Sequence, residues 1–294
     1  MDIRVLKYFL AVAREENITR AAESLHITQP SLSKQLMELE QETGKKLLVR
    51  GKRKISLTED GVLLRKRADE IVKLLEKTER ELSADTSQLS GEVSVGGNPT
   101  ATILRAASAL RQQNPEVQFR FYSSDATDVM ERLEHGSLDL AVFLEPIDNL
   151  RFEYISLPDT ARWGLLMASS CELAQRDSVR RADLLSVPLI FHRRAGLQRI
   201  ISRWAEADID NFSIAATYNV VSGSPERFVK SGLGYYLTIA DQLPEHLGDG
   251  VTFRPLSPEL NVRYALVWKR TALLSRASRA FLEMIRQTCS SSNL

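Results

Sequence analysis

The stretch "ITRAAESLHITQPSLSKQLMELE", residues 18–40, decides the fold of the N-terminal part of the chain. It contains two short helical patterns separated by a polar turn at residues 26–28. The second pattern begins with Thr28 as the expected N-cap and with Pro30 in the first turn, where a missing N–H costs nothing. Its apolar stripe consists of Leu32, Leu36 and Leu39. Two helices joined by so short a turn indicate a helix-turn-helix.

The polar side chains at the start of the second helix lie opposite that stripe. A helix-turn-helix places this part of its second helix in the DNA major groove, where glutamine pairs with adenine and lysine reaches guanine or phosphate. Each residue alone is more typical of a solvated helix face. Together with the turn, the proline and the basic segment that follows, they favour DNA contact. The predicted contacts are Thr28, Gln29, Pro30, Ser31, Ser33 and Lys34.

A basic hairpin is expected directly after this helix, which ends at Gly44. The strand-like runs 47–50 and 55–57 flank a basic tip, and six of the ten residues in 45–54 are Lys or Arg. Residues 1–67 hold 14 basic and 9 acidic residues, whereas residues 91–294 hold 22 and 23. The excess indicates a polyanion partner for the N-terminal part, although charge alone fits a solvated loop equally well. Arg50, Lys52 and Arg53 are predicted to contact phosphates or the minor groove.

A long helix is predicted after Thr58, over about residues 59–82. Its apolar positions follow spacings of 4, 3, 4, 3 and 4, a heptad pattern: Leu64, Ala68, Ile71, Leu75, Thr78 and Leu82. We interpret this seam as a dimerisation surface, with packing on the same chain as the alternative. Residues 83–92 are small and polar, which predicts a hinge.

The remaining residues alternate between strand and helix patterns, as expected of an α/β fold with parallel strands. Strands are predicted at 93–95, 117–121 and 138–143, with helices between them, and a second such set begins near Trp163. Ligands of parallel sheets bind beyond the carboxyl ends of the strands. The segments at these ends, rich in Ser, Thr or Gly, are 97–102, 123–125, 191–196 and 222–225.

The N-terminal ninety residues resemble the winged helix-turn-helix of LysR-type transcriptional regulators. The resemblance is based on Ala21-Ala22, Leu25, Gln29-Pro30, Leu32-Ser33, Leu36, Leu39-Glu40, Gly44, Leu47, Arg50, Leu57-Thr58 and Gly61. Leu48 departs from the pattern, since the family usually has Phe there, and Thr238 stands where many relatives have Pro. The remaining chain has the family's length and layout.

This resemblance implies three parts: a DNA-binding domain at 1–58, a linker helix and hinge at 59–90, and an effector-binding domain at 91–294. The last is similar to a periplasmic binding protein, with lobe I at about 91–161 and 267–294 and lobe II at about 162–266. The implied function is sequence-specific regulation, as activator or repressor, of promoters with an inverted repeat. The implied partners are a second copy through residues 59–82, a homotetramer, RNA polymerase and a small-molecule effector.

The effector is expected to be a small anion, because helix N-termini and hydroxyl groups converge where it would bind. The resemblance implies Thr100, Thr102 and Ser124 as contacts. His192 and Arg193 are added from the sequence pattern alone. Each Ser or Thr, taken singly, is equally explained as an ordinary helix cap. No metal and no other cofactor are expected.

Other classes of protein fit less well. The sequence has no GxSxG, HExxH or P-loop motif, and its four histidines are scattered, so an enzyme is not expected. A secreted solute-binding protein would need a signal peptide and would lack a winged helix. Two distant cysteines and no long apolar run suit a cytoplasmic protein without membrane contact. A ligand-independent architectural DNA-binding protein is the remaining alternative.

Overall fold

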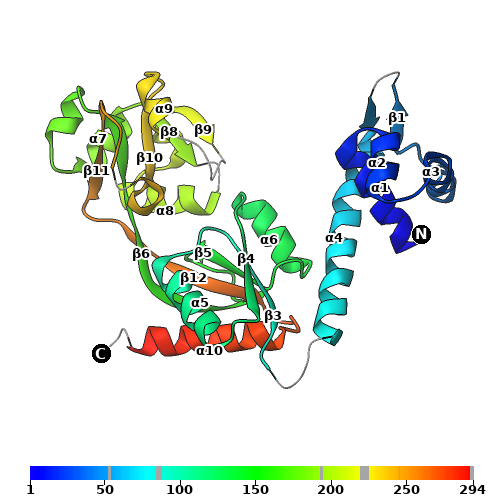
Figure 1. The fold of residues 1–294 in the computed structure, drawn as a ribbon. Coiled ribbons are helices and arrows are strands. Elements are labelled where there is room, and N and C mark those ends of the chain that lie inside the picture. The colour runs from blue at the N-terminus through cyan, green and yellow to red at the C-terminus, as the bar shows by residue number, and fades with distance from the viewer. Residues whose placement is uncertain (52–53, 84–87, 193–194, 219–224, 245, 292–294) are drawn as a thin grey trace. The chain divides into compact units, whose positions relative to one another are not determined.

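The structure is a computed structural model of the 294-residue chain. It describes all residues except 52–53, 84–87, 193–194, 219–224, 245 and 292–294. The chain divides into two compact units, residues 1–84 and 85–294, each with its own core (Figure 1). Within the described residues, no helix is both long and apolar enough to cross a membrane.

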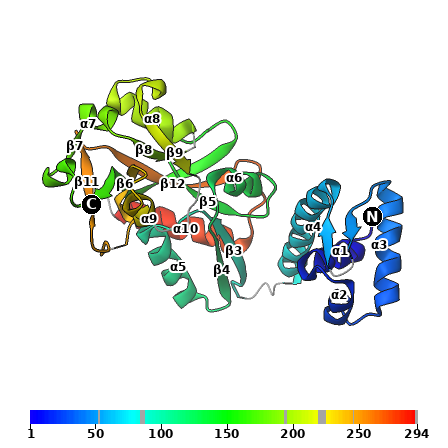
Figure 2. The same cartoon turned by 90° about the horizontal axis from the view of Figure 1, so that it is seen from above.

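The first unit is mainly helical and ends in a long helix. Its elements are α1 (Ile3–Glu15), α2 (Ile18–Ser24), α3 (Gln29–Thr43), β1 (Leu48–Arg50), β2 (Ile55–Leu57) and α4 (Glu59–Ser83). Figure 2 shows α1 between α3 and α4, and α1 contacts both. The strands β1 and β2 pair antiparallel, with Leu48 opposite Leu57. This is a winged helix-turn-helix, as predicted.

Local sequence explains the helix boundaries of this unit. The Asn17 side chain caps α2 by accepting from the N–H groups of Thr19 and Arg20. His26 has a φ of 54°, a left-handed conformation that allows the chain to reverse direction between α2 and α3. Gly44 ends α3 with a φ of 66°. The predicted leucine stripe of α3 is buried in the core together with Phe9 of α1.

The predicted seam of α4 is only partly free for a partner, because part of it packs on its own chain, which is the alternative that the sequence left open. Ala68 and Val72 are buried against Leu6 of α1, and Leu64 packs on the same cluster. Other apolar residues of α4 stay exposed, among them Ile71 of the predicted seam itself. Leu63, Ile71 and Leu74, with exposures of 58%, 41% and 47%, lie within about 80° of one another around the helix, which advances 100° per residue, and we call these three the exposed strip of α4. Val62 is exposed as well, on a different side of the helix.

The second unit is α/β. Its helices are α5 (Ala101–Gln113), α6 (Ala126–Glu134), α7 (Arg181–Ser186), α8 (Ala195–Ala205), α9 (Pro225–Lys230), α10 (Arg276–Ser291) and the short 3-10 turns η1 (Glu172–Gln175), η2 (Ile209–Asn211) and η3 (Ala240–Gln242). Its strands are β3 (Gly91–Gly96), β4 (Val117–Tyr122), β5 (Leu140–Leu144), β6 (Phe152–Ala168), β7 (Val179–Arg180), β8 (Leu189–His192), β9 (Ile214–Tyr218), β10 (Tyr235–Ile239), β11 (Val251–Ser257) and β12 (Asn261–Lys269).

These strands follow the order β4-β3-β5-β12-β6-β10-β8-β9, with β11 and β7 beside the main path. The pairs β3–β4, β3–β5, β8–β9 and β8–β10 are parallel, as predicted, whereas β6 and β12 run antiparallel to their neighbours. We call the strands β3, β4 and β5 with helices α5, α6 and α10 lobe I. We call the strands β8, β9 and β10 with helices α8 and α9 lobe II.

The strand β6 connects the two lobes, as Figure 1 shows. Its residues 152–162 pair with β12, and residues 163–168 pair with β10 and β11. The strand is therefore longer than the sequence predicted, since the expected second set of elements began only near Trp163. The predicted hinge is also shorter at its end, because β3 already begins at Gly91.

Candidate nucleic-acid interface and effector-binding residues

The start of α3 is open to solvent. Thr28 is its N-cap residue by backbone conformation, but within the described residues its side chain makes no capping hydrogen bond. Gln29, Ser31 and Lys34 are exposed, and Ser33 is half-buried. The first N–H groups of a helix carry partial positive charge and have no partner inside the helix. The N–H groups at this end of α3 can therefore donate hydrogen bonds to a phosphate oxygen.

Two pairs of side chains on this surface are already ordered. Gln29 Nε2 donates to Ser33 Oγ at 2.9 Å, which holds the glutamine amide along the helix. Lys34 Nζ lies 3.8 Å from Glu38 Oε1, an exposed ion pair that contributes little energy. Both side chains can exchange these partners for a base edge or a phosphate at small cost. The geometry thus fits direct contact in a major groove.

Two glutamates fix the base of the wing, a role that the sequence did not predict for either of them. Glu40 of α3 is buried, and its Oε1 accepts from the N–H groups of Leu47 (2.7 Å) and Leu48 (3.2 Å), directly before and in β1. The carbonyl of Glu16, after α1, accepts from Ile55 N–H of β2 at 2.9 Å. The Glu16 carboxylate also pairs with Lys54 Nζ at 2.6 Å. Each strand of the wing is thereby tied to a different helix.

A third contact explains why the motif needs a glycine where α4 begins. A Cβ atom at Gly61 would lie 2.1 Å from the carbonyl oxygen of Leu47, so only glycine allows this approach. The predicted contacts at the tip of the wing cannot be compared in the same way. Lys52 and Arg53, and the side chain of Arg50, lie outside the described part of the chain. Their contact with DNA stays a prediction.

In lobe I, two of the predicted effector contacts lie at the N-terminus of α5 and are buried. Thr100 is the N-cap, and its Oγ1 accepts from Ile103 N–H at 3.4 Å. The same Oγ1 donates to Oδ2 of Asp159 at 2.9 Å, and Thr102 N–H donates to Oδ1 of Asp159 at 3.3 Å. Thr102 Oγ1 accepts from Arg105. A carboxylate of β6 thus already occupies the positive end of α5.

The third predicted contact of lobe I, Ser124, lies beside α6. It shares hydrogen bonds with Tyr122 and Asp128. Burial opposes ionisation of Asp128, but the hydrogen bonds from Tyr122 and Arg132 outweigh it and hold the pKa of this carboxyl below its usual value. The neighbouring Ser123 Oγ bonds Asn98 Oδ1 at 3.0 Å, which joins the loop after β4 to the loop before α5.

In lobe II, His192 ends β8 directly opposite Tyr218 of β9. Their ring centroids are 4.6 Å apart, and Tyr218 stacks on Tyr236 at 4.4 Å. Burial raises the pKa of Tyr236 to about 12 and that of Tyr218 still further, so both phenols are neutral donors at physiological pH. Arg193 and residues 222–224 lie outside the described residues, so this side of the predicted site is described only in part.

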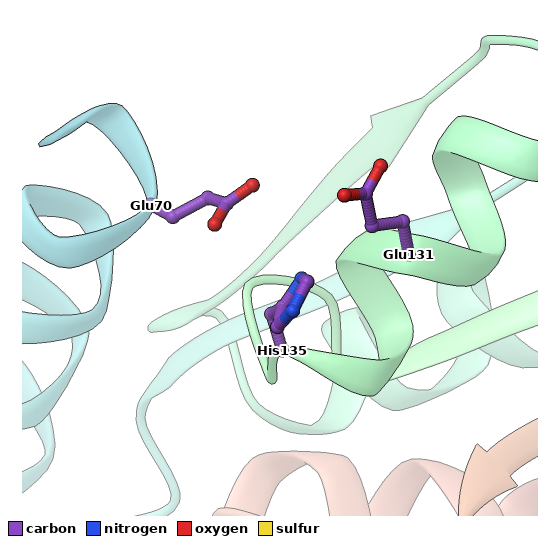
Figure 3. Close-up of side chains that lie close together, drawn as sticks. All are labelled: Glu70, Glu131 and His135. Carbon is purple, nitrogen blue, oxygen red and sulfur yellow. The ribbon is translucent and has the colours of Figure 1, made fainter. Parts of the chain in front are cut away.

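One pair of titratable side chains could contribute to a metal site. Glu131 and His135 lie one turn apart at the C-terminal end of α6, and Figure 3 draws them with Glu70 of α4, which belongs to the other unit. Two ligands from one helix are fewer than the three or four protein ligands of a zinc site. The pair therefore does not by itself indicate a metal.

Comparison with known proteins agrees with this architecture. Residues 3–62 match the family described as "Bacterial regulatory helix-turn-helix protein, lysR family", and residues 86–290 match "LysR substrate binding domain". The regulator IlvY of Escherichia coli is 30% identical over 223 residues, covering 74% of this chain and 75% of IlvY. The regulator BsdA of Bacillus subtilis is 26% identical and covers 97% of this chain and all of BsdA.

Solved structures show the same fold. The LysR family regulator CbnR matches with a TM-score of 0.75 at 20% identity, over 98% of this chain and 99% of CbnR. Full-length CbnR in complex with its target DNA matches with a TM-score of 0.74 at 21% identity, over 98% of this chain and 100% of that one.

Proposed function

The chain belongs to the LysR family of transcriptional regulators, and from this premise we propose that its α3 reads base edges within an inverted repeat. The observation that supports this most directly is the open N-terminus of α3, with exposed Gln29, Ser31 and Lys34 beside a free helix end. The wing supplies phosphate contacts through Arg50, Lys52 and Arg53. The recognition helix α3 and the wing of one protomer together contact one half-site of the DNA.

The exposed strip of α4 supports the proposal that a second copy of the chain binds there. Leu63, Ile71 and Leu74 form an apolar face that their own unit does not cover, which is costly in water unless a partner buries it. A two-fold pairing through this strip would present two α3 helices to one DNA duplex, matching an inverted repeat. Assembly of two such dimers into a tetramer is the further expectation from the family.

The substrate-binding domain takes a small-molecule effector between lobes I and II. Lobe I supplies Thr100, Thr102 and Ser124, and lobe II supplies His192 and, by the sequence pattern, Arg193. A ligand that binds one lobe arrangement better than the other shifts the population of the two. That shift changes how the protein contacts its promoter. The effector site and the DNA-binding site are then coupled, because the effector has different affinities for the two lobe arrangements.

The central experiment is selection of sheared genomic DNA from the source organism by the purified full-length protein at physiological salt. We expect discrete fragments that share an inverted repeat. Genes next to these fragments will indicate which metabolites to test as effectors. Uniform retention of all fragments, lost steeply as salt rises, would instead support the architectural alternative.

The dimer surface has its own test. Leu74→Asp places a charge in the middle of the exposed strip and should convert the dimer to monomer in analytical ultracentrifugation. Lys73→Ala is the matched control, because Lys73 pairs with Asp69 at 2.7 Å on a different face of α4. A Leu74→Asp protein that stays dimeric would show that the copies associate elsewhere.

A further inference from the structure

The carboxylate of Asp159 stands where an anionic effector would bind. It accepts hydrogen bonds from Thr100 Oγ1 and Thr102 N–H, two of the groups assigned to the effector in lobe I. Thr100 is only 9% exposed and Thr102 is fully buried, so these donors have little freedom to serve a second acceptor. The carboxylate also lies at the positive end of the thirteen-residue helix α5, which stabilises negative charge.

An irregularity in the sheet directs Asp159 to this position. Between the register pairs Ser156–Ala265 and Thr160–Arg263, β6 advances four residues while β12 advances two. Residues 157–159 therefore form a bulge opposite Tyr264. Bulges redirect side chains and are common next to functional sites. The bulge lies just before β6 leaves β12 and begins to pair with the strands of lobe II.

The surroundings of Asp159 also connect to lobe II. Tyr264 donates a hydrogen bond to Asp241, which lies in η3 directly after β10. The pKa of Tyr264 is raised, mainly by burial, then by the hydrogen bond to Asp241 and the negative charges of Asp241 and Asp159. The phenol therefore stays protonated. Through Tyr264, Asp159 of the connecting strand β6 is thus linked to η3, directly after β10 of lobe II, as well as to α5.

We propose that Asp159 is a specificity-determining residue that competes, as a carboxylate tethered to the chain, with the anionic group of the effector for the donors of Thr100 and Thr102. This inference rests on the proposed effector function of the two lobes. An anion binds α5 by displacing Asp159, so weak or poorly placed anions are rejected. Displacement also releases the bulge of β6 from lobe I.

The test uses full-length protein and two simple anions, acetate and sulfate, titrated at constant ionic strength. Midpoints of thermal unfolding give the half-saturating concentration of each anion for the wild type and for Asp159→Ala. We expect Asp159→Ala to bind at least one of the anions at a tenfold or greater lower concentration than the wild type. Asp159→Asn keeps one carbonyl acceptor without the charge and should show a smaller gain, which guards against misfolding of the alanine variant.

Two further variants make the result specific. Glu153→Gln removes a carboxylate from the same strand, where Glu153 faces Arg270, and should bind as the wild type does. The double variant Thr100→Val with Asp159→Ala should lose the gain, because the hydroxyl donor is gone. Equal half-saturation in wild type, Asp159→Ala and Asp159→Asn would overturn the proposal, as would a gain that persists in the double variant.

Failure of the effector function itself would look different. DNase footprints on a selected promoter, with and without the anion, report the coupling to DNA. If Asp159→Ala gains anion binding while its footprint does not change, the competition at α5 is supported and the proposed coupling between effector and promoter is wrong.

Discussion

Helices α3 and α5 begin with the same kind of N-cap residue, but the start of α3 is exposed and the start of α5 is buried. Each follows a threonine N-cap, Thr28 and Thr100, in an extended conformation. The start of α3 is exposed, and the Thr28 side chain makes no capping bond among the described residues. The start of α5 is buried, capped by Thr100 and closed by the carboxylate of Asp159.

The difference shows what each end can bind. In the described part of the chain, the Thr28 side chain makes no bond to the first N–H groups of α3, so a DNA phosphate can bind them without breaking such a cap. The donors of α5 already have an anionic partner, so a ligand must compete with it. A helix N-terminus is therefore a free anion site only where the rest of the fold leaves it open.

The largest predicted effect is a loss of DNA affinity on changing the start of α3. Replacing both Gln29 and Ser33 with Ala removes the paired side chains and should lower affinity for a selected site by about 100-fold or more, since a good base contact contributes about 1–3 kcal/mol. Affinity for random duplex should not change. Fluorescence anisotropy with both duplexes measures this, and Gln35→Ala, on the same helix and bonded to Glu38, is the control.

The second effect concerns the other end of α3. Glu40→Ala leaves the buried N–H groups of Leu47 and Leu48 without their acceptor and should lower the free energy of unfolding by about 2–3 kcal/mol. Glu40→Gln keeps an acceptor oxygen and should recover most of this loss. Urea unfolding of the two variants compares them, and equal losses would show that the charge matters more than the two hydrogen bonds.

A matched pair of substitutions tests the comparison directly. Thr100→Ala removes a side chain that both caps α5 and holds Asp159, so the free energy of unfolding should fall by about 1–2 kcal/mol. Thr28→Ala removes a side chain with no capping bond and should cost less than about 0.5 kcal/mol. Urea unfolding measures both. Equal costs would mean that the two helix starts do not differ in solution.

The smallest effect is expected from a single phosphate contact. Lys34→Ala should weaken binding to specific and random DNA alike and should reduce the slope of log affinity against log salt by about 0.9. A salt titration from low to physiological ionic strength gives the slope. A change in sequence preference without a change in slope would place Lys34 on a base edge instead of a phosphate.

The sequence alone was sufficient for the helix-turn-helix, because its signals are local. The leucine spacing of α3, the cap at Asn17 and the glycine after α3 each act within a few residues. The same holds for the alternating strands and helices of the second unit. Burial of Glu40 had a weak signal too, an acidic residue directly after Leu39 of the buried stripe.

The free faces of these elements depended on tertiary packing. The heptad pattern of α4 did not reveal that α1 buries Ala68 and Val72, because the partner face belongs to the first helix of the chain, far from α4 in sequence. The Pro158-Asp159 pair could have indicated a bulge in a strand. Nothing near it indicated that its carboxylate would reach α5.

The sequence by itself determined which helices and strands form and that residues 18–40 make a DNA-binding motif, because capping and periodicity act over short distances. Only the tertiary structure decided which polar ends stay open. Thr28 and Thr100 are the same residue in the same local role. Asp159, brought to α5 from 59 residues further along the chain, distinguishes them.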